Sequence, residues 1–94
     1  MHDGIEREES ETGGRYVLRR DGAEAELTFS RLGETRWIAD HTAVPEPMRG
    51  TGAGLALAER LVADARAAGV RIVALCPFVK AQARKHPEWA DVVE

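Results

Sequence analysis

Arg49 begins a glycine-rich segment, residues 49–54, that directly precedes a long stretch with helical periodicity. Glycine has no side chain, so a loop built from it brings its backbone N–H groups close to a ligand. The first turn of a helix adds N–H groups without partners and a partial positive charge. The segment therefore predicts a cradle for a pyrophosphate, to which the arginine adds a charge-assisted contact. Its six residues are Arg49, Gly50, Thr51, Gly52, Ala53 and Gly54.

Two other phosphate-binding motifs do not fit this segment. No Gly-Lys-Ser or Gly-Lys-Thr follows the glycines, as a P-loop requires. A Rossmann dinucleotide site is disfavoured because the glycines follow a run of strands and no acidic residue ends a suitable later strand. A loop whose glycines serve only a tight turn is the remaining alternative.

His41 and Cys76 are the two side chains outside the segment whose chemistry suits proton transfer or nucleophilic attack. Histidine titrates near neutral pH, which makes His41 a candidate general base; a structural histidine is the alternative. Cys76 directly precedes Pro77, where a helix is expected to begin, and a helix N-terminus favours the thiolate. The thiol could act as a covalent nucleophile, act as an acid or hydrogen-bonding contact, or pack as a small apolar residue.

Length and composition predict one soluble domain. The chain has 94 residues, of which 44% are hydrophobic and 31% charged. No apolar run approaches the ~20 residues that cross a bilayer, and the acidic start is not a signal peptide, so we expect a cytoplasmic protein with no membrane partner. A single cysteine excludes an intrachain disulfide and disfavours a zinc site, and no metal is expected.

Charge is distributed unevenly along the chain. Residues 1–14 are rich in acids and end in Gly13-Gly14, so we predict a disordered acidic tail there and a compact domain over residues 15–94. The remainder is about neutral, which gives no reason to expect a nucleic-acid partner. Between residues 65 and 87 every charged side chain is basic, which is typical of a solvated face and alternatively of an anion site. These residues are Arg66, Arg71, Lys80, Arg84 and Lys85.

Three strands are expected before the glycine segment. Residues 16–20 and 23–30 flank Asp21-Gly22, a dipeptide typical of a tight hairpin. Residues 35–44 form a third, central strand, because both of its faces are partly apolar. Strict alternation along this strand places four side chains on one face: Trp37, Ala39, His41 and Ala43.

A β-α-β-α unit is expected after these strands. The helix that follows the glycines ends at Gly69, residues 71–76 form a strand, and Pro77 starts a short helix. We predict an α/β (α+β) fold with a mixed sheet, in which an antiparallel meander precedes a β-α-β crossover. The two strands of that crossover lie parallel and adjacent.

Several segments resemble the GNAT superfamily of N-acetyltransferases. The glycine segment fits the acetyl-CoA motif of that family, Arg/Gln-x-x-Gly-x-Gly/Ala, between a long central strand and a helix. Three further segments are similar to those of a subfamily of very short GNAT proteins. They are His41-Thr42-Ala43-Val44, Cys76-Pro77-Phe78-Val79 and His86-Pro87-Glu88-Trp89. The resemblance covers residues 16–93 and implies a GNAT-like sheet whose parallel strands splay apart.

The resemblance implies how acetyl-CoA would bind. Backbone N–H groups of residues 49–54 would hold its pyrophosphate. The pantetheine arm would run between the splayed strands and pair with backbone groups of Ala43 and Val44. The acetyl carbonyl would lie near His41, Thr42 and Cys76. Three basic residues are candidates for the adenosine phosphates: Lys80, Arg84 and Lys85.

The resemblance further implies an N-acetyltransferase in which an amine attacks acetyl-CoA directly in a ternary complex. The amine would belong to a small molecule or a protein lysine, and the protein would be a monomer or a homodimer. GNAT domains usually carry helices between their first two strands that help form the acceptor site, whereas Asp21-Gly22 joins those strands here. We therefore expect an open acceptor site. A CoA- or acyl-CoA-binding module without turnover, and a scaffold that binds neither, are the alternatives.

Overall fold

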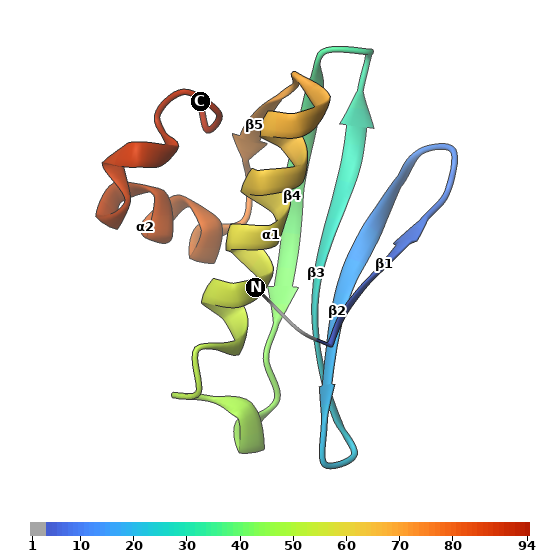
Figure 1. The fold of residues 1–94 in the computed structure, drawn as a ribbon, viewed down its shortest axis with the longest axis vertical. Helices are drawn as coiled ribbons and strands as arrows, with labels where there is room; N and C mark the ends of the chain where they lie inside the picture. Colours follow the sequence, from blue (N-terminus) through green and yellow to red (C-terminus); the bar gives the residue numbers. More distant parts are fainter. Residues whose placement is uncertain (1–3) are drawn as a thin grey trace.

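Five strands form one mixed sheet in the order β1-β2-β3-β4-β5, and a long helix covers one face of it (Figure 1). The computed structural model describes residues 4–94. The pairs β1–β2, β2–β3 and β3–β4 are antiparallel, and the pair β4–β5 is parallel, which confirms the predicted mixed sheet. The elements are β1 (Ile5–Glu9), β2 (Gly13–Arg20), β3 (Ala23–Leu32), β4 (Arg36–Ala43), η1 (Glu46–Met48), α1 (Ala53–Ala68), β5 (Arg71–Ala74), α2 (Pro77–Lys85) and η2 (Pro87–Trp89).

The turn between β2 and β3 has the conformation that its dipeptide predicts. Asp21 and Gly22 both have positive φ, at 48° and 80°, as a tight hairpin turn requires. The two strands pair from Arg20↔Ala23 at the turn to Gly13↔Ser30 at the far end. The predicted hairpin is confirmed, and both of its strands are longer than predicted.

The N-terminal segment corrects the sequence prediction. Ile5–Glu9 forms β1, which pairs with β2 from Ile5↔Leu18 to Glu9↔Gly14. The prediction of a disordered tail over residues 1–14 is therefore wrong for β1 and for the two glycines that begin β2. Residues 1–3 lie outside the described residues. Composition suggested disorder because the segment is acidic, but its acids form ion pairs with arginines of the sheet, as Glu8 does with Arg15 at 2.8 Å.

Arg7 anchors β1 to the core. Its guanidinium lies over the rings of Trp37, Phe29 and Tyr16, at 5.2, 5.7 and 5.8 Å from their centroids. The same group donates a hydrogen bond to the Asp64 carboxylate of α1 at 3.0 Å. Cation–π contacts and charge-assisted hydrogen bonds both gain strength where water is excluded. A charged residue thus holds the edge strand, which explains why hydropathy did not indicate it.

Replacing Arg7 with alanine should lower the free energy of unfolding by about 2 kcal/mol, because both kinds of contact are lost together. Amide hydrogen exchange should rise more in β1 than in β2. Arg19→Ala is the matched control, because its ion pairs lie on an exposed surface, where each contributes about 0–1 kcal/mol. Equal losses in the two variants, measured by urea unfolding, would contradict the anchoring role.

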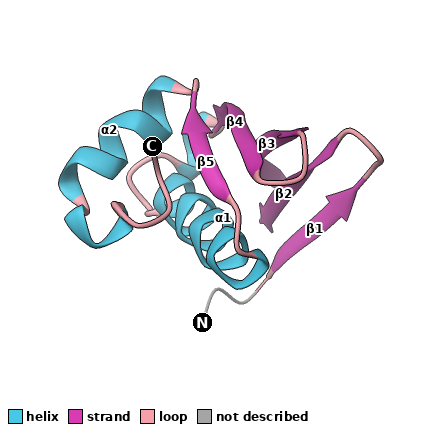
Figure 2. Cartoon of the chain, turned by 90° about the horizontal axis from the view of Figure 1, so that it is seen from above, coloured by secondary structure: helices cyan, strands magenta, loops and turns pink. Residues whose placement is uncertain are grey.

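Helix α1 packs its apolar stripe on the sheet. Leu57, Ala58, Leu61 and Ala65 recur at helical spacing and are fully buried. Gly69 ends the helix in the left-handed conformation, with φ of 73°. Helix α2 lies beside α1 and contacts β4 and β5 (Figures 1 and 2). In residues 4–94, neither helix is long and apolar enough to cross a bilayer.

The side of the sheet away from α1, which we call the open face, carries charged side chains instead. Among residues 4–94, no helix covers β1, β2 and β3 on this side (Figure 2). Arg15 donates to Glu8 and Glu26 at 2.8 and 2.7 Å, and Arg19 donates to Glu24 at 2.9 Å. These long side chains cover the strands so well that an apolar residue between them, Val17, is fully buried.

Candidate functional site

The glycine segment forms the turn that leads into α1. Gly50 and Gly52 have φ of 77° and 83°, a left-handed conformation that favours glycine, and Gly52 is the N-cap of the helix. The helical ladder begins where the Ala56 N–H donates to the Gly52 carbonyl at 2.9 Å. Within residues 4–94, four N–H groups of the segment donate to no backbone carbonyl: those of Gly50, Gly52, Ala53 and Gly54. Such a set of free donors is what an anion cradle needs.

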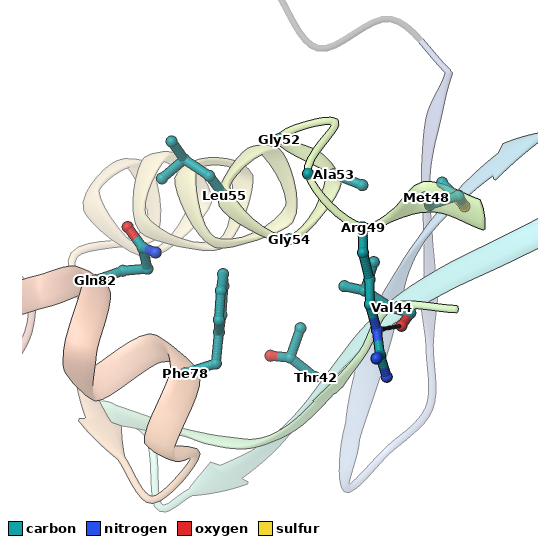
Figure 3. A pocket seen from close by; sticks show the side chains of 11 residues that line it. Thr42, Val44, Met48, Arg49, Gly52, Ala53, Gly54, Leu55, Phe78 and Gln82 are labelled. Carbon is teal, nitrogen blue, oxygen red and sulfur yellow. Dashed lines mark hydrogen bonds between the residues drawn. The ribbon is translucent and has the colours of Figure 1, made fainter. Parts of the chain in front are cut away.

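A pocket of about 410 Å³ opens at this end of α1, between the glycine segment, the end of β4 and α2 (Figure 3). Its walls combine backbone of the segment with apolar side chains from all three elements. The lining residues are Thr42, Val44, Met48, Arg49, Gly50, Gly52, Ala53, Gly54, Leu55, Phe78 and Gln82. The structure therefore brings Val44 together with five of the six predicted residues of the segment.

Arg49 and Thr51 make contacts within the loop. The Arg49 Nε donates to the Val44 carbonyl at 3.3 Å, so the guanidinium lies beside Val44 at one side of the pocket (Figure 3). The Thr51 hydroxyl donates to the Met48 carbonyl, and Thr51 does not line the pocket. Val44 was predicted to pair with pantetheine through its backbone, and its carbonyl thus has a partner within the chain that a ligand using this group would have to share or displace.

Helix α2 supplies lining residues to which the sequence analysis assigned no role in binding. Phe78 and Gln82 are one turn apart and both face the pocket. A Cβ at Gly54 would lie 2.8 Å from the Cζ of Phe78, so the glycine lets this ring approach α1 closely. Their spacing along the chain indicates that Phe78 and Gln82 share one face of α2. That this face lines the pocket follows only from the packing of α2 against α1.

Strands β4 and β5 part beside the pocket. They pair only from Arg36↔Arg71 to Ala39↔Ala74. The N–H groups of Leu75 and Cys76 both donate to the Ala39 carbonyl, at 3.1 and 2.9 Å, and this ends the ladder. β5 ends at this point, two residues earlier than predicted, and the rest of β4 runs on without a strand beside it; we call the space beside this part of β4 the gap.

One side-chain contact links the two strands where they separate. The Thr42 hydroxyl and the Cys76 thiol lie 3.3 Å apart, and either can be the donor. Cys76 is only 3% exposed and occupies the N-cap position of α2, as the sequence predicts. The thiol therefore sits at the inner end of the gap between the strands, next to a residue that lines the pocket.

A β-bulge in β4 overturns the predicted position of His41. Thr28 pairs with His41 and Phe29 with Ala39, so Asp40 is one extra residue on β4. A bulge re-aims the side chains that follow it. His41 therefore does not share the buried face of Ala39, as strict alternation predicted, but is exposed, like Asp40. Thr42 takes the position opposite the buried Leu27 and faces the pocket.

The basic residues of α2 do not converge on the glycine segment. Lys80 and Arg84 line a second pocket of about 270 Å³, formed with Trp89 and the C-terminal residues. Lys85 is exposed and lines neither pocket. The predicted contact of these three side chains with adenosine phosphates therefore gains no support from their placement. Among residues 4–94, no group of histidine, cysteine and acidic side chains is arranged to hold a metal ion.

Comparison with known proteins adds an independent line of argument. A family model described as GCN5-related N-acetyl-transferase matches residues 15–92. The chain belongs to this family. Among solved structures, a GCN5-like protein from Staphylococcus aureus, determined by NMR in solution, is similar to it over 98% of this chain and 90% of that chain, with a TM-score of 0.75 and 28% sequence identity. A search of curated proteins found no match.

Membership of the GCN5-related N-acetyltransferase family gives the pocket a chemical context. A member of this family is expected to transfer an acetyl group, and the pocket at the start of α1 joins free backbone donors to the part of β4 that runs past the end of β5. This pocket is therefore the candidate site.

Proposed function

We propose that this protein transfers the acetyl group of acetyl-CoA to an amine, by direct attack of the amine in a ternary complex. One observation carries the proposal: free N–H groups at the start of α1 and the part of β4 that runs past the end of β5 border the same pocket. A pyrophosphate suits the first feature and an extended thioester arm suits the second. The family to which the chain belongs supports acetyl transfer in particular.

The residues present fit such a ligand. A Cβ added at Gly50 or Gly52 would meet no heavy atom within 4 Å, so space for phosphate oxygens exists beside the backbone. Val44, Leu55 and Phe78 offer apolar contacts to a pantetheine arm. The Arg49 guanidinium at the mouth can move from a neutral carbonyl to an anion at little cost, because its present hydrogen bond is a long one.

Bound acetyl-CoA would supply a thioester carbonyl that a neutral amine attacks, forming an amide and releasing the thiol of CoA. His41 is exposed on the open face and is our candidate to accept the proton that the amine loses. The Cys76 thiol, next to Thr42 at the inner end of the gap, is our candidate to hydrogen-bond or protonate the departing sulfur. In this assignment the acceptor approaches from the open face and the cofactor from the pocket.

Cys76→Ser should retain acetyl-CoA affinity within about threefold and lower kcat by about 10-fold, because the hydroxyl keeps the contact to Thr42 but is a weaker acid than the thiol. Calorimetry and a thiol-release assay measure the two quantities. Intact-protein mass spectrometry after mixing the natural protein with acetyl-CoA should show no added acetyl group. An acetyl group trapped on Cys76 would instead establish a covalent double displacement.

A CoA-binding module without turnover is the second candidate, and one observation favours it. Within residues 4–94 no helix covers the open face of β1–β3, and His41, which pairs with Thr28 at the edge of this face, is exposed, so an acceptor there would be poorly enclosed. Calorimetry with acetyl-CoA tests both candidates together, and no binding at high micromolar cofactor would reject both. Thiol release across a panel of amines then separates them, because a binding module releases no CoA beyond the uncatalysed rate.

A further inference from the structure

Asp40 differs from the other carboxylates of the open face in having no cationic partner. Glu6, Glu8, Glu24 and Glu26 each form an ion pair with Arg15 or Arg19. Asp40 instead accepts a hydrogen bond from the hydroxyl of Ser30, and no basic side chain among the described residues pairs with it. A neutral donor thus holds this carboxylate in place without compensating its charge.

The bulge in β4 places this charge beside the candidate base. Asp40 and His41 are consecutive, yet both are exposed, because the extra residue interrupts the alternation of the strand. Ser30, which holds Asp40, lies on β3 opposite Ile38, so the carboxylate leans toward β3 and away from the gap between β4 and β5. The Asp40 carboxylate therefore lies near the place where an acceptor would meet His41, on the side of β4 that faces β3 and not on the side of the gap.

We propose that Asp40 binds a second positive group of the acceptor, which makes the substrate an aliphatic amine with two cationic centres. The inference rests on the proposed acetyl transfer. The reacting nitrogen must lose a proton before it attacks, and a carboxylate beside it would raise its pKa and oppose that loss. An uncompensated carboxylate set aside from the gap is better matched to a cation that stays charged throughout. A free diamine and a lysine next to a second basic residue in a peptide both have this chemistry.

The test compares acceptors that differ only in the second charge, with the full chain and saturating acetyl-CoA. The free pair is 1,4-diaminobutane and butylamine; the peptide pair is a capped lysine peptide with an arginine or a glutamine as its neighbour. In at least one pair, kcat/KM should be about fivefold higher for the dicationic member, as for one exposed ion pair. Asp40→Asn should reduce that ratio to about one, and added salt should reduce it in the natural protein. The pair that shows the effect identifies the source of the acceptor.

Glu34→Gln is the matched control, because it removes one exposed negative charge in the turn between β3 and β4, at the other end of β4. It should leave the ratio unchanged, whereas Ser30→Ala should lower it partly by releasing the Asp40 carboxylate. A ratio that Asp40→Asn does not change, or that Glu34→Gln changes equally, would overturn the inference alone. No acetyl-CoA binding, or no thiol release from any amine, would overturn the proposed function and this inference with it.

Discussion

Gly52→Glu should weaken acetyl-CoA binding at least about 100-fold, to the limit of detection in calorimetry. The Gly52 N–H is one of the free donors at the start of α1, and φ there is 83°. A carboxylate at this position would add a like charge beside the proposed pyrophosphate and a side chain in the space that its oxygens need. A non-glycine residue at this φ also costs about 1–2 kcal/mol of backbone strain.

Gly33→Glu is a close control for that experiment. Gly33 also has positive φ, at 65°, and an added Cβ there meets nothing within 4 Å, but it lies in the turn between β3 and β4, away from the pocket. The two variants therefore share the backbone strain and the new charge. Circular dichroism should show both folded. If Gly52→Glu bound acetyl-CoA as tightly as Gly33→Glu, the glycine segment would not be the phosphate cradle.

Gly13→Ala should destabilise the fold by about 3 kcal/mol, the largest effect that we expect from a single added methyl group. A Cβ at Gly13 would lie 2.1 Å from the carbonyl oxygen of Phe29 and 2.8 Å from the Cα of Ser30. Both atoms belong to the backbone of β3, so no side-chain movement relieves the clash and the two strands must separate at this end. The midpoint and slope of urea unfolding measure the loss.

Gly33→Ala is the control for this second prediction, because its Cβ enters open space and only the positive φ disfavours it, at about 1 kcal/mol. A loss in Gly13→Ala no greater than in Gly33→Ala would show that β2 and β3 pack less closely here than the structure indicates. Neither residue touches the pocket, so acetyl-CoA affinity of the folded fraction should stay unchanged in both variants.

Local signals predicted most of the scaffold. Asp21-Gly22 marked the hairpin, Gly69 marked the end of α1, and Pro77 marked the start of α2, because each imposes a backbone conformation that neighbours hardly alter. The glycine segment was predicted on the same basis, since its free N–H groups follow from the start of a helix. These features depend on residues close in sequence, which is why pattern analysis found them.

Features that depend on distant residues were missed. β1 is held by Arg7, whose partners lie on β2, β3, β4 and α1, and its composition alone indicated disorder. The bulge at Asp40 leaves no trace in the period-two pattern, so His41 was placed on the wrong face. Phe78 lines the pocket because its ring packs closely against Gly54 of α1. This contact could not be predicted without knowing how the two helices pack.

The extra residue in β4 has a consequence for comparing this protein with its relatives. Against a relative whose strand lacks the bulge, a pairwise match without a gap opposite Asp40 would equate Thr42 with a position that points to the other surface. Two homologues could then seem to exchange a pocket residue for a surface one although neither had changed. Equivalent residues on this strand have to be identified from the backbone hydrogen bonds to β3. Substitutions compared in this way can be divided into those on the face of the pocket and those on the open face.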